Sequence, residues 1–312
     1  MHLTLLFFFF FYKNLRFSYK DTKRQGRCFK VFENFFKKNG NFRDEWKCLL
    51  CTKKMRTKEE IVKNWLTRYT GLPLEKFGEY ILLTNFRYYV ELFAHTYQVD
   101  IVGDDKAMVN ATAENITIID FSIGSPMAAT IMDLLSAIKP KAVLFLGKCG
   151  GIKPYNKLGD FILPIAAIRG EGTSNDYFPP EVPALPAFNL QKTTSSSIRD
   201  AGQDYWTGTI YSTNRRVWEH DEEFKKYLRK IRVMGVDMET ATLFSVGFYN
   251  RIPTGALLLV SDRPMLADGV KTIESDKLVT KNFVRLHLDI GIRSLYKLME
   301  ENITIKHLRF EL

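Results

Sequence analysis

The chain has 312 residues, a net charge of +10 at neutral pH and a hydrophobic content of 46%. This length allows one large α/β domain with a sizeable core. The charge invites a nucleic-acid partner, but residues 1–54 hold nine Lys and four Arg against two Asp and two Glu, and so carry +9 of the +10. The remaining body is almost neutral, which excludes a basic nucleic-acid-binding domain there.

The first 54 residues also differ from the body in other respects. They contain 11 of the 24 phenylalanines and three of the four cysteines. Directly after them, Thr57 and Glu60 have the spacing of a capping box, which predicts that a helix begins here. We therefore expect two parts: residues 1–54, a basic Phe-rich extension that is disordered or not native, and residues 55–312, a catalytic domain.

Neither a membrane partner nor secretion is expected. Residues 3–12 are apolar, but ten residues are too few to span a bilayer, and no charged start or small-residue cleavage site accompanies them. Cys48 and Cys51 have the spacing of zinc ligands, yet no second Cys or His pair follows, so no metal is expected. Cys149 alone in the body fits a reducing cytoplasm. An RNA-binding role would rest on residues 1–54 alone, because the body lacks interleaved stacking motifs.

Apolar runs with strand character alternate with helical patterns along the body. The expected strands are 80–84, 108–113, 116–121, 142–146, 160–168, 232–236 and 255–260. The expected helices are 85–97, 126–138, 239–248 and 278–299, and the expected loops are 147–151 and 172–186. Such alternation predicts an α/β fold with three layers, α/β/α, around a central mixed sheet.

Acidic residues follow two of these expected strands. Asp237, Met238 and Glu239 come after residues 232–236, and Asp262 comes shortly after residues 255–260. Ligands of open α/β sheets bind beyond the carboxyl ends of the strands. Two carboxylates with a thioether between them suit a small polyol beside a group that needs a proton. The alternative is that the acids only cap the start of a helix.

Residues 236–241, followed by residues 260–262, resemble the signature of the nucleoside phosphorylase and nucleosidase superfamily. The resemblance extends over roughly residues 78–312. Three further segments, 178–183, 207–218 and 306–310, resemble the AMP nucleosidases of that superfamily. This resemblance implies cofactor-free hydrolysis of the N-glycosidic bond of AMP to adenine and ribose 5-phosphate, by a homohexamer built as a trimer of dimers.

The resemblance also implies roles for the acidic residues. Asp262 protonates N7 of the purine as it leaves, or instead begins a loop with Arg263 as its ion-pair partner. Glu239 accepts hydrogen bonds from the ribose hydroxyls, and Met238 packs on the apolar face of the sugar. Asp237 either faces the base or caps the following helix.

Phosphate recognition differs from that of the phosphorylases. Those enzymes bind inorganic phosphate with an Arg two residues before the first Gly of the 147–151 segment, and with a Ser or Thr directly after this Gly. Here Phe145 and Lys148 occupy the two positions. Since an apolar ring cannot hold an anion, this favours water as the nucleophile. Lys148 beside Gly147 either meets the phosphate of the substrate or is a solvated loop lysine.

Five other residues complete the expected substrate site. Arg215 and Arg216 suit a 5′-phosphate or stack on adenine, and Arg169 lies in a segment that resembles a loop beside the pocket. Trp218 is either an aromatic wall or a core residue. Ser125 lies at an expected helix start, which is a weak anion-site signal.

Two other functions stay open from the sequence. One is a purine nucleoside phosphorylase or nucleosidase that acts on unphosphorylated nucleosides. The other is a nucleotide-binding protein without turnover, which has no need for the acid Asp262.

Overall fold

The structure, a computed structural model, describes residues 56–301. The expectations for residues 1–54, including the Cys48/Cys51 pair, and for the 306–310 motif lie outside the described residues. The expected first helix is confirmed: α4 (Lys58–Thr70) begins after Thr57, which caps it with Glu60 in a reciprocal capping box. No helix in the described range is long and apolar enough to cross a membrane.

Eight strands form one mixed sheet. They are β1 (Tyr80–Thr84), β2 (Asn110–Ala113), β3 (Ile116–Asp120), β4 (Ala142–Gly151), β5 (Phe161–Gly170), β6 (Tyr205–Thr213), β7 (Gly235–Asp237) and β8 (Thr254–Asp262). Their order is β2-β3-β1-β4-β7-β6-β5-β8, and β4 also pairs with β8. The strands from β4 to β8 therefore curl into a ring, while β3, β1, β4 and β8 run parallel.

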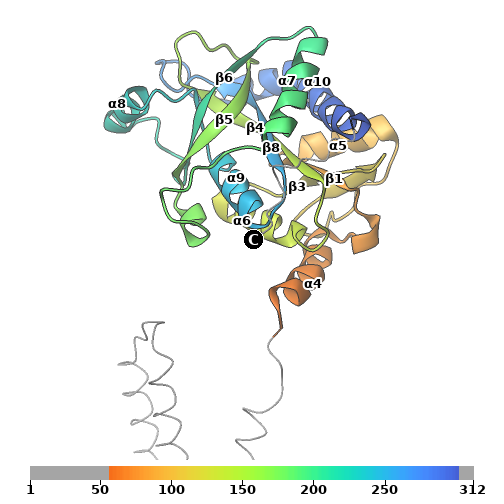
Figure 1. Cartoon of the computed structure of the whole chain (residues 1–312). Helices are drawn as coiled ribbons and strands as arrows, with labels where there is room; N and C mark the ends of the chain where they lie inside the picture. Colours follow the sequence, from red (N-terminus) through yellow and green to blue (C-terminus); the bar gives the residue numbers. More distant parts are fainter. Residues whose placement is uncertain (1–55, 302–312) are drawn as a thin grey trace, which may run out of the picture. The chain divides into compact units, whose positions relative to one another are not determined.

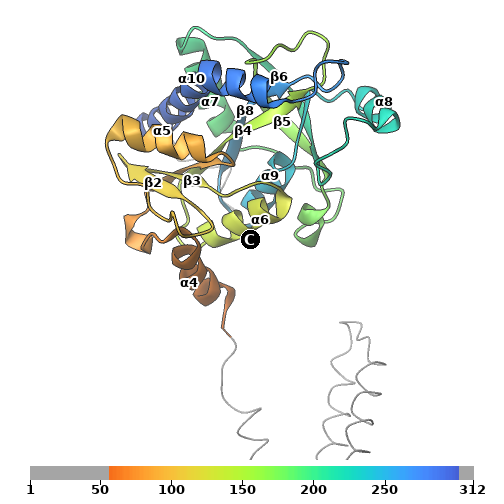
Figure 2. The same cartoon turned by 180° about the vertical axis from the view of Figure 1, so that it is seen from behind.

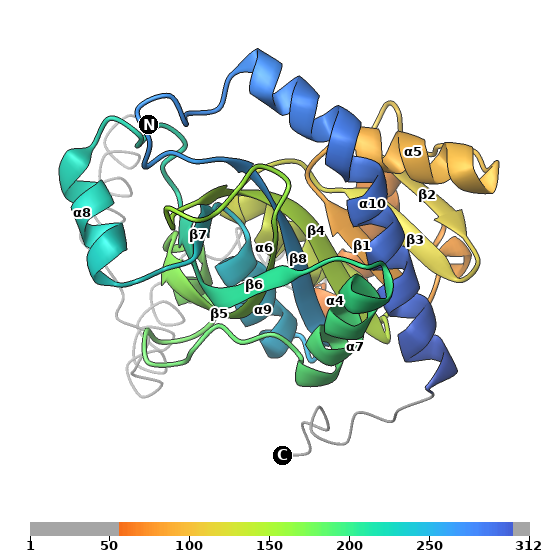
Figure 3. The ribbon, with the colours of Figure 1, turned by 90° about the horizontal axis from the view of Figure 1, so that it is seen from above.

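Helices cover both faces of the sheet (Figures 1 and 2). On one face lie α5 (Arg87–Tyr97), α7 (Phe188–Asp200) and α10 (Ile273–Glu300); on the other lie α4, α6 (Ser125–Leu135) and α9 (Thr240–Tyr249). The short helix α8 (Glu222–Lys230) lies beside the sheet, away from α5 (Figure 3).

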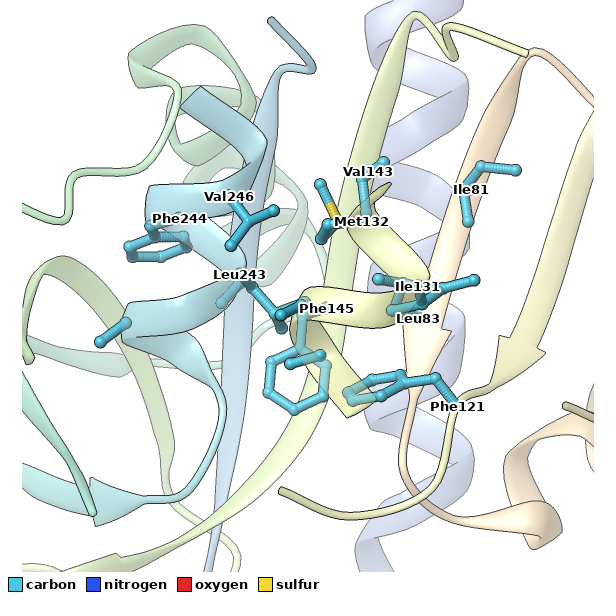
Figure 4. Packing of buried hydrophobic residues seen from close by; sticks show 14 of the residues in the cluster. Ile81, Leu83, Phe121, Ile131, Met132, Val143, Phe145, Leu243, Phe244 and Val246 are labelled. Carbon is cyan, nitrogen blue, oxygen red and sulfur yellow. The ribbon is translucent and has the colours of Figure 1, made fainter. Parts of the chain in front are cut away.

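Successive residues of β1 alternate between two hydrophobic cores, as the pleat of a strand requires. Ile81 and Leu83 of β1 join the core under α6 and α9, whereas Leu82 joins the core under α5 and α10. Phe145 of β4 packs in the first core against Phe121 (Figure 4). The expected three-layer fold with a mixed sheet is confirmed.

One expected loop is in fact a strand. Residues 147–151 extend β4, and Gly147 and Lys148 pair with Leu258 and Leu259 of β8. Backbone pairing with two neighbouring strands outweighs the turn propensity of the three glycines here. The 172–186 segment contains only the short 3₁₀ helix Thr173–Asp176.

Candidate active site

A pocket with about 580 Å³ of empty space lies at the ends of β1, β4, β7 and β8. It brings together eight of the eleven expected site residues. These are Lys148, Arg215, Arg216, Trp218, Asp237, Met238, Glu239 and Asp262.

Asp262 is the last residue of β8 and is partly buried. Burial raises the pKa of its carboxyl group, while the hydroxyl of Ser261, which donates to Oδ1 over 2.7 Å, and the charges of Lys271 and Arg216 oppose this rise. No ion pair joins Asp262 to Arg263 in the described part of the chain, so the alternative in which Arg263 neutralises it is wrong. A partly buried carboxyl group that retains its proton more readily than usual suits a general acid.

Glu239 lies at the start of α9, and its carboxylate does not cap that helix. Oε1 accepts a hydrogen bond of 2.7 Å from the backbone N–H of Gly124, and Oε2 accepts one of 3.2 Å from that of Met238. Burial, and then the charge of Asp237, raises the pKa of Glu239 to about 8. The amide of Asn85, another pocket residue, forms a hydrogen bond that opposes the rise.

Of the two roles expected for Asp237, facing the base or capping the following helix, the structure shows the second. Its Oδ2 accepts a hydrogen bond of 2.8 Å from the backbone N–H of Thr240, and the Thr240 hydroxyl also donates to it. Its Oδ1 accepts one of 2.6 Å from the hydroxyl of Ser212. Burial raises the pKa of Asp237 and these hydrogen bonds lower it. Oδ2 is therefore committed to the start of α9, and Oδ1 to Ser212 of β6.

Lys148 enters the pocket from β4 with only 4% of its side chain exposed. Its ammonium group lies 3.0 Å from Asp276 Oδ1 and donates to the Thr280 hydroxyl over 3.0 Å. Lys271, a pocket residue that was not expected, lies 2.8 Å from the same Asp276 oxygen. Both ammonium groups also face the ring of Phe86. Two cations around one carboxylate leave a net positive charge at this end of the pocket.

The other expected cations are more exposed. Arg215 forms an ion pair of 2.7 Å with Asp221, and Arg216 lies 3.4 Å from Glu219. Trp218 is 5% exposed and packs edge-on against Phe224, so it is a core residue that also lines the pocket.

Three expected substrate-binding residues lie outside the pocket lining. The guanidinium of Arg169 donates six hydrogen bonds within residues 174–182, so it holds this loop. The hydroxyl of Ser125 donates to the carbonyl of Met238 over 2.5 Å. Gly147 lies in β4 beneath the ring of Phe145, where a Cβ would stand 2.4 Å from the ring. Their contacts support loop 174–182, the Met238 backbone and the core.

Comparisons with known proteins show to which family this chain belongs. The model of the phosphorylase superfamily matches residues 76–295. The chain belongs to this superfamily. The AMP nucleosidase of Escherichia coli (strain K12) is 26% identical over 282 residues, which cover 76% of this chain and 58% of that protein. The chain thus spans less than two thirds of this relative's length. The uridine phosphorylase of Treponema pallidum (strain Nichols) is 25% identical over 240 residues, covering 71% of this chain and 91% of the relative.

One solved structure matches this chain over almost the whole of its own length, unlike the Escherichia coli relative. The crystal structure of AMP nucleosidase from Bacteroides thetaiotaomicron VPI-5482 is 57% identical, with a TM-score of 0.72. The match covers 79% of this chain and 99% of that one. In the chain described here, Phe145 is fully buried in the core, so its ring takes no part in anion binding.

Proposed function

We propose that this chain hydrolyses the N-glycosidic bond of AMP to adenine and ribose 5-phosphate. The observation that carries the proposal is the meeting of two carboxyl groups with raised pKa values in one pocket: half-buried Asp262 at the end of β8 and buried Glu239 just after β7. Two relatives that are AMP nucleosidases support the choice of substrate.

Asp262 is the general acid of the proposed reaction. As the bond between C1′ and N9 breaks, its electron pair moves into the purine, and N7 takes the proton of Asp262. Water adds to C1′ and loses a proton, which restores the acid. A positioned acid contributes roughly 10²- to 10⁴-fold to the rate.

Glu239 and Met238 hold the ribose. In its ionised form Glu239 accepts hydrogen bonds from the 2′- and 3′-hydroxyls, and the thioether of Met238 packs on the sugar. Gly124 and the Met238 backbone already fix the carboxylate, which reduces the entropy lost on binding.

The substrate phosphate binds at the basic end of the pocket. Lys148, together with Lys271, supplies the ammonium groups, and Arg215 and Arg216 either join them or stack on adenine. With Phe145 buried, the phosphorylase arrangement for inorganic phosphate is lost, and water is the nucleophile. Asp237 and Trp218 shape the pocket wall.

The proposed assembly rests on the resemblance to the superfamily, and the proposed cellular setting rests on Cys149. The catalytic domain comprises residues 55–312, and residues 1–54 are an extension that catalysis does not require. The protein forms a homohexamer arranged as a trimer of dimers, and the buried free thiol of Cys149 fits the cytoplasm.

The test is product analysis with the purified full chain. AMP, adenosine and inosine are incubated with and without inorganic phosphate, and the released base and sugar are identified. We expect adenine and ribose 5-phosphate from AMP, at a rate independent of phosphate. A ribose 1-phosphate ester would instead identify a phosphorylase, and equal cleavage of adenosine would identify a nucleosidase for unphosphorylated substrates. Binding of AMP without release of adenine would identify a non-catalytic nucleotide-binding protein.

A further inference from the structure

A second pocket lies beside the C-terminal ends of β4 and β8. It has about 700 Å³ of empty space. Its lining comes from the end of β4, the last turn of α8 and the turn after β8. The lining residues are Gly151, Ile152, Lys153, Pro154, Arg229, Arg263, Met265 and Leu266.

Three of these residues are cations, and no Asp or Glu is among them. Among the described residues, the side chains of Lys153, Arg229 and Arg263 form no ion pair and donate no hydrogen bond. The charge of Arg229 does reach Glu222 on its own helix, but that carboxylate is bonded first to Lys225. Concentrated positive charge without counter-charge in a concave site attracts anions.

This pocket lies back to back with the candidate active site. Gly150 lines the active site and Gly151 lines the second pocket; Asp262 and Arg263 are divided in the same way. The backbone N–H of Arg263 also donates to the carbonyl of Gly269 over 2.8 Å, closing a turn that ends just before Lys271. The residues that face the second pocket are therefore covalent neighbours of residues in the first.

We propose that Lys153, Arg229 and Arg263 form a binding site for a small multivalent oxyanion such as phosphate or pyrophosphate. Two guanidinium forks and an ammonium group provide enough donors to surround a tetrahedral anion. Ile152, Met265 and Leu266 form the apolar part of the lining. The proposal holds whatever reaction the first pocket performs.

The bound anion links α8 to the turn that follows β8. Arg229 is in the last turn of α8, and Arg263 begins the 263–269 turn. An anion that contacts both restricts this turn, and with it the segment that joins Asp262 to Lys271. The site is thus placed to affect the geometry of the active site without contact with substrate.

The experiment measures pyrophosphate binding to the full chain by isothermal titration calorimetry. A Lys153→Ala/Arg229→Ala double variant tests the site, since Arg229 is exposed and Lys153 is half-buried, and neither belongs to the hydrophobic core. The matched control is Lys157→Ala/Lys230→Ala, which removes two exposed cations from the same loop and the same helix but outside the pocket. Lys148→Met removes a cation from the active site instead.

We expect the test variant to bind pyrophosphate at least tenfold more weakly, while the control and Lys148→Met retain wild-type affinity. Three results would overturn the proposal: wild-type protein that does not bind, a test variant that binds as well as the control, or binding that only Lys148→Met removes. The last result would place the anion in the active site. Circular dichroism of each variant shows whether the fold is retained.

Discussion

The backbone N–H of Gly124 donates a hydrogen bond of 2.7 Å to Oε1 of Glu239. This bond joins the start of α6 to the start of α9, and the Ser125 hydroxyl reinforces it through the carbonyl of Met238. Gly124 has φ +97° and ψ 156°, a conformation that essentially only glycine adopts. The turn before α6 is therefore shaped to hold the proposed ribose-binding carboxylate.

Substitution Gly124→Ala should raise KM for AMP several-fold, because the turn must rearrange and the hydrogen bond to Glu239 weakens. Backbone strain of this kind costs about 1–3 kcal/mol, so the variant should also unfold at lower temperature. Gly202→Ala is the control, since Gly202 also has a positive φ, +70°, with open space around it. It should lose stability but keep the wild-type KM. An unchanged KM in Gly124→Ala would remove the turn from substrate binding.

Asp262→Asn should lower turnover by about 10²-fold or more while AMP still binds, because the amide keeps the shape and cannot donate the proton. Steady-state kinetics with a separate binding titration distinguish the two effects. Exposed Asp268→Asn is the control. Near-normal turnover in Asp262→Asn would assign the acid elsewhere, with Asp237 as the next candidate.

The same substitution should stabilise the empty protein at neutral pH. Folding raises the pKa of Asp262, so the folded state disfavours its ionised form. The free energy of unfolding therefore decreases as pH rises from the pKa of this group in the unfolded chain, about 3.9, through its higher pKa in the folded protein. In urea titrations, the advantage of Asp262→Asn over wild type should be large at pH 8 and small at pH 4. An advantage that does not depend on pH would contradict the burial of a charge as its cause.

The pKa of Glu239, about 8, predicts proton release on nucleotide binding. Near neutral pH the empty site holds this group largely protonated, whereas ribose hydroxyls donate to the ionised form and lower its pKa. Calorimetry at pH 7 in buffers of different ionisation enthalpy should show protons released as AMP binds. The release should disappear in Glu239→Gln. If the variant releases as many protons as wild type, Glu239 does not accept from the ribose.

The sequence predicted where the acidic residues lie, because apolar runs locate the two strands at whose ends Asp237 and Asp262 stand. Expected strand 80–84 matches β1, and Asp262 ends β8. It did not predict Lys271 or Asn85, since neither belongs to a motif and only the curled sheet brings them to the pocket. Arg169 was misplaced for a related reason: its partners are mostly backbone carbonyls, which residue types do not reveal.

Removal of residues 1–54 should leave thermal unfolding and activity unchanged, because the capping box of Thr57 and Glu60 that begins α4 remains. A chain that begins at Ile61 instead lacks the whole capping box. It should lose about 1 kcal/mol in stability. Aggregation or inactivity of the chain that begins at Met55, while the full chain works, would contradict the proposed domain boundary.

Lys148→Met should separate recognition of the substrate phosphate from cleavage. One charged hydrogen bond is worth roughly 1.5–3 kcal/mol, so kcat/KM for AMP should fall about 10- to 150-fold. The residual cleavage of adenosine, which has no phosphate, should change much less. Arg216→Gln should act in the same direction if its guanidinium also reaches the phosphate, and exposed Lys157→Met should change neither substrate. Equal losses with AMP and adenosine would show that Lys148 only supports the pocket through Asp276 and Thr280.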